Sequence, residues 1–163
     1  MRRRHHVHAG GLTLLEALLA AVVLAMAASA VIMPYAVGAQ AAMRDARQTL
    51  AVNLAQDMME EILSKSFSDP DGKEKGEKDR SSWDDMSDYD GYEEKAGTIR
   101  SFDGTLVDDP AATGLSRHVS VVGVYVSGQD TRQPPTFLRV TVEVRYKGQT
   151  LTRLSRLVYA NAS

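Results

Sequence analysis

The chain has 163 residues, a quarter of them charged, and no cysteine. This length leaves room for one modest domain and excludes a large enzyme core. Without its first 11 residues, which hold three basic and no acidic residues, the chain carries 16 basic and 21 acidic residues, a formal net charge of -5. An acidic protein of this kind is not expected to bind nucleic acid. Because there are no cysteines, an exported domain would be held together by packing and not by disulfides.

The N-terminus carries a basic leader followed by a long uncharged run. Residues 1–11 contain three arginines and three histidines and end in two glycines. After Glu16, no charged residue occurs in the 27 positions 17–43. A helix needs roughly 20 apolar residues to cross a bilayer. The sequence therefore predicts a membrane-inserted N-terminus, with residues 12–39 as the transmembrane helix.

Glu16 is the one charged residue at the start of this helix. A carboxylate on the first turn of a membrane helix is costly, so it is a candidate functional group with a partner to be identified. If the chain were cut after Gly11, Leu12 would carry a free α-amino group four residues before Glu16, one helical turn away on the same face. The amine and the carboxylate could then neutralise each other, within one chain or between neighbouring chains.

This N-terminal stretch resembles the prepilin processing motif of the type IV pilin and pseudopilin superfamily. The residues that carry the resemblance are Gly10-Gly11-Leu12-Thr13-Leu14-Leu15-Glu16, with the basic leader before them and the apolar run after them. The resemblance implies that a membrane aspartic peptidase cleaves after Gly11 on the cytoplasmic face and methylates the new N-terminus at Leu12, where phenylalanine is commonest in the family. It also implies that Glu16, with Thr13 before it, serves filament assembly.

Two other interpretations of the N-terminus remain open. The basic leader, the apolar run and Ala28-Ser29-Ala30 would also suit a secretory signal peptide with a small-residue cleavage site. The same residues would suit an uncleaved signal anchor. The apolar run is long beside the roughly 7–15 residues of a signal-peptide core, and a signal peptide gains nothing from Glu16. Both features favour the prepilin interpretation.

The predicted helix continues as an amphipathic segment over residues 40–65. Its apolar residues recur at spacings of three or four, which indicates a helix with one apolar face. They are Met43, Ala46, Leu50, Leu54, Met58 and Ile62, and polar residues that include Glu61 fill the other faces. The two segments would form one helix of about 50 residues, roughly 75 Å long, with a kink expected at Pro34. Residues 53–63 also resemble the end of this helix in I-type minor pseudopilins of type II secretion and their V-type pilus relatives.

Residues 66–113 are rich in glycine, proline, serine and charge, and we expect them to form an acidic surface loop. Within this segment, carboxylates alternate with aromatic residues. Oxygen-rich aspartate clusters with a glycine turn suit calcium, and the candidate ligands are Asp84, Asp85, Asp88 and Asp90. The segment fails the EF-hand pattern, which would require ligands at Met86 and Gly97. A solvated acidic loop without calcium is the other interpretation.

Residues 114–163 are typical of antiparallel strands. The segment 118–126 is β-rich, and residues 137–146 alternate apolar and polar side chains. Lys147-Gly148 then offers a two-residue turn into a further strand over 150–159. Three strands with one apolar face would cover the helix. The expected fold is therefore α+β, with a long N-terminal helix packed on a small antiparallel sheet as in pilin-like proteins.

The sequence gives little support to an enzyme. Beyond the leader, His118 is the only histidine, and the chain has neither a glycine-rich phosphate loop nor an HExxH motif. The resemblance instead implies a structural subunit, more typical of minor than of major ones, of a type IV pilus-like or type II secretion pseudopilus filament. It implies three partners: a prepilin peptidase, other pilin or pseudopilin subunits, and inner-membrane lipid.

By the positive-inside tendency, the arginines of the leader predict a cytoplasmic N-terminus and an extracytoplasmic C-terminal domain. The resemblance implies that the membrane is a bacterial inner membrane. The alternative function is a membrane-anchored extracytoplasmic binding or sensor domain with an uncleaved signal anchor. That class of protein would need neither Glu16 nor removal of the leader.

Overall fold

The computed structural model describes residues 13–70 and 79–159. The leader and the expected processing residues Gly10, Gly11 and Leu12 lie outside the described residues. The chain divides into two compact units, residues 1–42 and 43–163. All four strands belong to the second unit.

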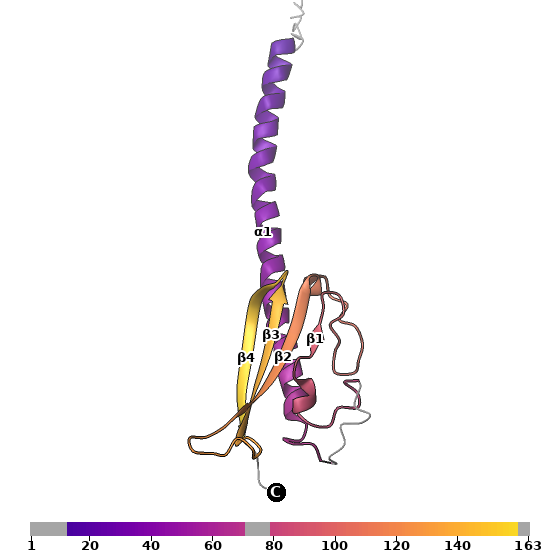
Figure 1. Cartoon of the computed structure of the whole chain (residues 1–163). Helices are drawn as coiled ribbons and strands as arrows, with labels where there is room; N and C mark the ends of the chain where they lie inside the picture. Colours follow the sequence, from indigo (N-terminus) through magenta and orange to yellow (C-terminus); the bar gives the residue numbers. More distant parts are fainter. Residues whose placement is uncertain (1–12, 71–78, 160–163) are drawn as a thin grey trace, which may run out of the picture. The chain divides into compact units, whose positions relative to one another are not determined.

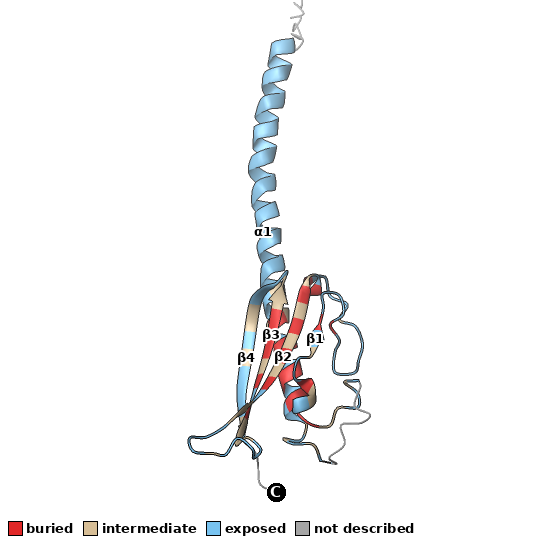
Figure 2. Cartoon of the chain, viewed as in Figure 1, coloured by how far each residue is buried: buried red, intermediate tan, exposed pale blue. Residues whose placement is uncertain are grey.

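Helix α1 (Leu14–Leu63) is a single helix of 50 residues (Figure 1). Its sequence is dominated by alanine, leucine and methionine, which are strong helix formers. Pro34 lies inside the helix and does not end it. The prediction that the apolar and amphipathic segments form one helix is confirmed. In Figure 2, α1 is exposed through its first part and carries buried residues only where it lies against the strands.

The sheet has four antiparallel strands in the order β1-β2-β3-β4. They are β1 (Glu93–Glu94), β2 (Leu115–Val124), β3 (Phe137–Tyr146) and β4 (Gln149–Tyr159). Lys147 and Gly148 join β3 to β4 with φ angles of 48° and 84°. Positive φ at both positions matches the twist that a two-residue hairpin requires, and glycine adopts it without strain. The predicted hairpin is confirmed, whereas β1 adds a fourth strand that the sequence did not indicate.

The core lies between the inner face of the sheet and the last part of α1. Val140, Val142 and Val144 of β3 are buried, and their neighbours on the other face are mostly exposed or half-buried. From α1, Leu54, Met58 and Ile62 are buried against them. This arrangement confirms the α+β layout, in which the apolar face of an amphipathic helix covers one face of an antiparallel sheet.

The buried face of α1 differs from the predicted stripe at both ends. Met43 and Ala46 were expected in the stripe but are exposed, because burial of α1 begins near Leu50. Ala51, Ala55 and Met59 are buried in addition to the predicted residues. Glu61 was placed on the polar side, and this prediction is wrong: its side chain is buried, with partners that lie far along the chain.

The segment 66–113 is predicted from the sequence to be a surface loop, but some of its residues are part of the hydrophobic core. Its described residues, 66–70 and 79–113, include two short 3-10 helices, η1 (Ser87–Tyr89) and η2 (Pro110–Ala112), together with β1. Met86, Tyr89 and Ile99 are buried and belong to the hydrophobic core cluster. Elements of two or three residues carry no helical or strand periodicity, so the sequence pattern could not reveal them.

Candidate functional site

Helix α1 begins with a hydrogen-bonded turn built from two of the predicted assembly residues. The hydroxyl of Thr13 accepts a hydrogen bond from the backbone N–H of Glu16 at 3.3 Å, and its carbonyl accepts one from Ala17 at 3.0 Å. Thr13 is thus the N-cap and Glu16 the third helical residue, as in a capping box. A carboxylate in the first turn is also stabilised by the helix dipole. The hydrogen bond between the Thr13 hydroxyl and the backbone N–H of Glu16 therefore holds Glu16 in the first turn of α1.

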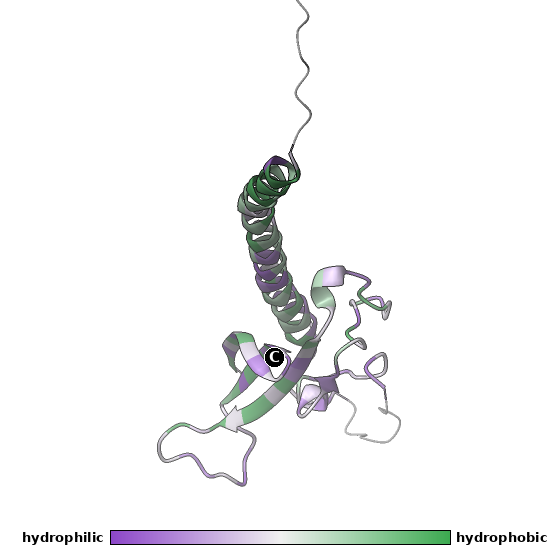
Figure 3. Cartoon of the chain, turned by 90° about the horizontal axis from the view of Figure 1, so that it is seen from above, coloured by the Kyte–Doolittle hydropathy of each residue, from purple (hydrophilic) through white to green (hydrophobic). Residues whose placement is uncertain are grey.

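The first part of α1 meets the length and composition requirements for crossing a membrane. It contains a stretch of 18 residues that is apolar enough to cross a bilayer, and none of that stretch is buried. Figure 3 shows this part of the helix coloured mostly as hydrophobic. A signal sequence meets the same criterion, so the finding supports one membrane-spanning helix without deciding whether it is cleaved. Pro34, Gly38 and Ala42 help to line an open apolar notch in it.

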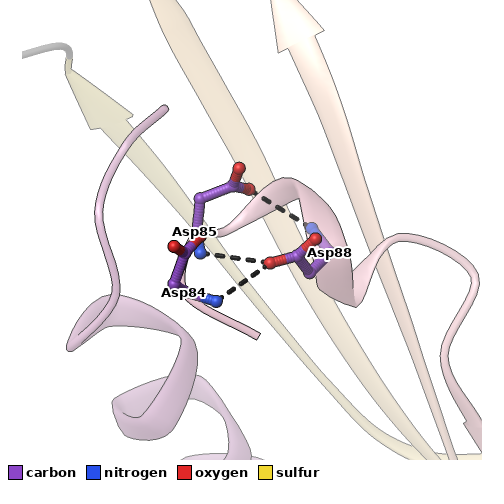
Figure 4. A group of neighbouring side chains, drawn as sticks. All are labelled: Asp84, Asp85 and Asp88. Carbon is purple, nitrogen blue, oxygen red and sulfur yellow. Dashed lines mark hydrogen bonds between the residues drawn. The ribbon is translucent and has the colours of Figure 1, made fainter. Parts of the chain in front are cut away.

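Three of the four predicted calcium ligands lie together (Figure 4), and the fourth does not. Asp84, Asp85 and Asp88 have candidate ligand oxygens within 4.8 Å of one another. Asp90 instead accepts a hydrogen bond from the backbone N–H of Val121 in β2 at 2.8 Å. Its carboxylate therefore ties the segment to the sheet.

The aspartate cluster already has hydrogen-bond donors from its own backbone. Asp88 Oδ2 accepts bonds from the N–H groups of Asp84 and Asp85, both at 3.1 Å. Asp85 Oδ1 accepts from the N–H and the hydroxyl of Ser87, both at 2.5 Å, and from the N–H of Asp88 at 3.3 Å. Aspartates commonly stabilise turns in this way. Calcium takes six to eight oxygen ligands, so three carboxylates would need help from other oxygens, and calcium binding stays a prediction.

Sequence reasoning missed a group of four charged residues, three buried and one half-buried, which we call the ion network. Its members are Glu61 from α1, Arg80, Glu94 from β1 and Arg117 from β2. The side chains of Glu94 and Arg117 are 3% and 1% exposed. One signal was available: Arg117 shares the inward parity of Leu115 and Val119, where an unpaired charge would be very costly.

Glu94 is at the centre of the ion network. Its Oε2 accepts from Arg117 Nε at 2.6 Å, and its Oε1 is 3.3 Å from Arg80 Nη1. The hydroxyl of Tyr92 and the N–H of Arg100 each donate to Oε1 at 3.0 Å. The carboxylate is therefore bonded on both oxygens, as a buried charge requires.

The two arginines connect this centre to helix α1. Arg117 donates to the carbonyl of Leu54 in α1 at 2.9 Å. Arg80 pairs with Glu61 through two nitrogens, of which Nε lies 2.6 Å from Oε1. The hydroxyl of Tyr89 donates to the same oxygen at 2.9 Å. The ion network thus attaches the segment after α1, β1 and β2 to the helix.

The pKa directions of Glu61 and Tyr89 favour a permanent charge pair between Glu61 and Arg80. Burial opposes the charged form of Glu61, but the bonds from Arg80 and Tyr89 outweigh it and hold the pKa of Glu61 below its ordinary value. Burial raises the pKa of Tyr89, and the hydrogen bond to the negatively charged Glu61 raises it further. The Tyr89 hydroxyl therefore stays protonated and remains a hydrogen-bond donor. A general acid or base needs a pKa near the working pH. The pKa of Glu61 moves away from neutrality, which suits a structural role.

No protein-family model matches the chain, and searches of curated proteins and of solved structures likewise found no match. The resemblance to prepilins therefore stays a prediction from residues 1–16 and the helix that follows.

Replacing Asp85 tests whether the aspartate cluster is a turn or a calcium site. Asp85→Ala removes an acceptor of three hydrogen bonds and should lower the free energy of unfolding by about 1–3 kcal/mol. We expect the same loss in EDTA and in millimolar calcium, measured by urea unfolding of the full chain with the fluorescence of Trp83, the one tryptophan. Asp79→Ala, at an exposed position, is the control. A loss seen only in calcium would establish a metal site instead.

Glu94→Gln tests the ion network. The substitution leaves the Arg117 charge buried without its carboxylate, so the free energy of unfolding should fall by about 3–5 kcal/mol. The matched control is Glu93→Gln, which makes the same change at the exposed neighbouring residue and should alter stability by less than about 0.5 kcal/mol. Urea unfolding of both variants gives the comparison. Equal stability of the two variants would show that the buried pair contributes nothing.

Proposed function

We propose that this chain is a subunit of a type IV pilus-like or type II secretion pseudopilus filament. In this proposal it is made as a prepilin, cleaved after Gly11 and methylated on Leu12. The observation that carries the proposal is the start of α1. There, Thr13 and Glu16 form a capped first turn at the head of a membrane-length apolar helix whose continuation packs on a sheet.

The mechanism of such a subunit would be binding and polymerisation. The first part of α1 would hold each copy in the membrane until assembly. Glu16 would then pair with the α-amino group of Leu12, of its own or an adjacent subunit. The cap on Thr13 supports this role because it holds the carboxylate on the first turn. Desolvation strengthens the attraction between the two charges and penalises a subunit that is inserted out of register.

The first unit also has an apolar notch in α1 that would suit close packing between helices. Gly38 and Ala42, four residues apart, share an open notch, and small residues at this spacing let helices approach closely. In this proposal the arginines of the leader stay in the cytoplasm and the second unit is extracytoplasmic. The partners would be a prepilin peptidase, which removes the leader, and neighbouring subunits.

Glu16→Gln separates the charge of Glu16 from its place in the helix cap. Glutamine is accepted at this position of a capping box, so membrane insertion and the helix start should be preserved. Because glutamine cannot neutralise an amine, incorporation into sheared filaments should fall to background. Thr13→Ala, which removes the cap at a cost of about 0.5–2 kcal/mol but keeps the acid, serves as the comparison. Wild-type incorporation of Glu16→Gln would contradict the assembly role.

The intact mass of the protein from membranes of its own host tests the processing step. A chain that begins at Leu12 and carries one added methyl group is the expected product, with peptide mapping to locate the methyl group on the N-terminus. A chain that begins at Val31 would instead indicate a secreted domain. A chain that retains residues 1–11 would indicate the anchored binding or sensor domain, and the filament proposal would then be dropped.

A further inference from the structure

One exposed surface of the second unit is an acidic groove beside α1, which we call the helix-side groove. It has a volume of about 420 Å³ and is lined by Asp57, Glu60, Glu61, Ser64, Ser101 and Phe102. Phe102 is 74% exposed. Glu61 is bound to Arg80, whereas Asp57 and Glu60 form no ion pair with any residue that the structure describes. The groove therefore offers two uncompensated carboxylates next to an exposed aromatic ring.

A second exposed surface, which we call the sheet patch, lies on the face of the sheet that points away from α1. It consists of Val122, Arg139, Leu157 and Tyr159. Arg139 is the cross-strand partner of both Val122 and Leu157, and Leu157 is 55% exposed. Within residues 13–70 and 79–159, Arg139 has no acidic partner. Arg145 and Arg153, on the same face, are already held by Glu143.

The helix-side groove and the sheet patch complement each other in charge and in apolar character. Scattered exposed apolar residues need no explanation, but a contiguous apolar patch bordered by polar residues is typical of an interaction surface. Among the described residues, Asp57 and Glu60 of the groove have no ion-pair partner, and Arg139 of the sheet patch has none either. They lie on opposite faces of one unit, because the sheet patch has the outward parity of strands whose inward residues pack on α1.

We propose that copies of this chain dock head to tail, with Arg139 and Leu157 of one copy seated in the helix-side groove of the next. The guanidinium would face Asp57 and Glu60 in charge-assisted hydrogen bonds. It would also lie near the Phe102 ring, as a cation over an aromatic face. The inference rests on the proposed function and extends it by naming the surfaces through which the second units of neighbouring subunits meet.

Symmetric contacts between copies are disfavoured by the same charges. A contact of sheet patch with sheet patch would bring Arg139 against Arg139, and a contact of groove with groove would bring four carboxylates together. Like charges placed opposite each other at an interface are strongly unfavourable. A head-to-tail contact avoids both arrangements. Because it joins different surfaces and leaves one of each free at the ends, it can propagate along a filament.

The absence of cysteine makes a disulfide test direct. Ser101→Cys places a thiol in the helix-side groove, and Ser155→Cys places one on the outward face two residues before Leu157. The two full-length variants are reconstituted together in lipid vesicles and mildly oxidised. Since each chain has one thiol, every disulfide joins two chains. We expect a cross-linked dimer from the mixture in several-fold excess over either variant alone. No dimer from the mixture, or an equal yield from one variant alone, would overturn the proposal.

Charge reversal identifies the contact. Arg139→Glu in the Ser155→Cys chain should lower the yield of dimer about tenfold, because it places a carboxylate against Asp57 and Glu60. Adding Glu60→Arg to the Ser101→Cys chain should restore much of that yield. Arg44→Glu makes the same charge change at an exposed position of α1 outside both surfaces and should leave the yield unchanged. Equal losses from Arg139→Glu and Arg44→Glu would refute the specific contact.

The cross-link and the filament assay fail independently. The vesicles contain this chain alone, so the disulfide requires neither cleavage after Gly11 nor the charge of Glu16. If Glu16→Gln enters filaments normally, the proposed assembly mechanism is wrong even where the disulfide forms. If the disulfide does not form while Glu16→Gln blocks assembly, the docking contact is wrong and the filament role stands.

Discussion

A helix can be covered by one small sheet only where its apolar residues share a single face, and α1 meets this condition over its last turns alone. From residue 17 to 43 the helix has no charge on any side, and a helix that is apolar all round belongs in lipid or among other apolar helices. Charged residues begin at Arg44, and burial by the sheet begins near Leu50. The change in composition coincides with the boundary between the two compact units. The sheet, the short elements and the ion network are all built on the amphipathic turns after it.

The elements that local patterns specify could be predicted. Strand β3 follows from strict alternation, the β3–β4 turn from Lys147-Gly148, and α1 from residue spacing, because each signal lies within the element itself. The ion network could not be predicted in the same way. Arg117 bonds to Glu94, 23 residues away, and to the carbonyl of Leu54, 63 residues away. Only its inward parity in β2 hinted that it had a buried partner.

The aspartate segment shows a second limit of sequence reasoning. Asp84, Asp85, Asp88 and Asp90 lie within seven positions, and their closeness in the sequence predicts one set of ligands. The structure keeps three together and bonds the fourth to Val121. Whether a side chain turns toward its own loop or toward the sheet depends on where the strand passes, and β2 begins far along the chain. The sequence shows that the segment is rich in aspartates. Only the tertiary structure shows that three of them stabilise a turn and that the fourth bonds to the sheet.

The ion network is better understood as specifying position than as a source of net stability. The cost of removing two charges from water largely offsets their attraction, and apolar residues of similar shape often serve as well. Apolar residues, however, would accept many placements of the segment 79–100 on α1. Arg80 and Arg117 accept few, because each must meet a carboxylate and also, for Arg117, the carbonyl of Leu54. In a chain without cysteines, paired buried charges can hold a long irregular segment in one place.

A groove lined by six residues is small beside the roughly 20–30 residues that each partner contributes to a stable interface of free proteins. The same contact is stronger between chains anchored in one membrane. Anchoring gives every copy the same orientation and confines the copies to a plane. Part of the translational and rotational entropy is therefore lost before the copies associate, and association costs less. A second contact between linked modules then forms at a high effective concentration. In the proposed filament, packing of the apolar helices would supply that linkage, and a weak contact between Arg139 and the helix-side groove would set the register between neighbouring units.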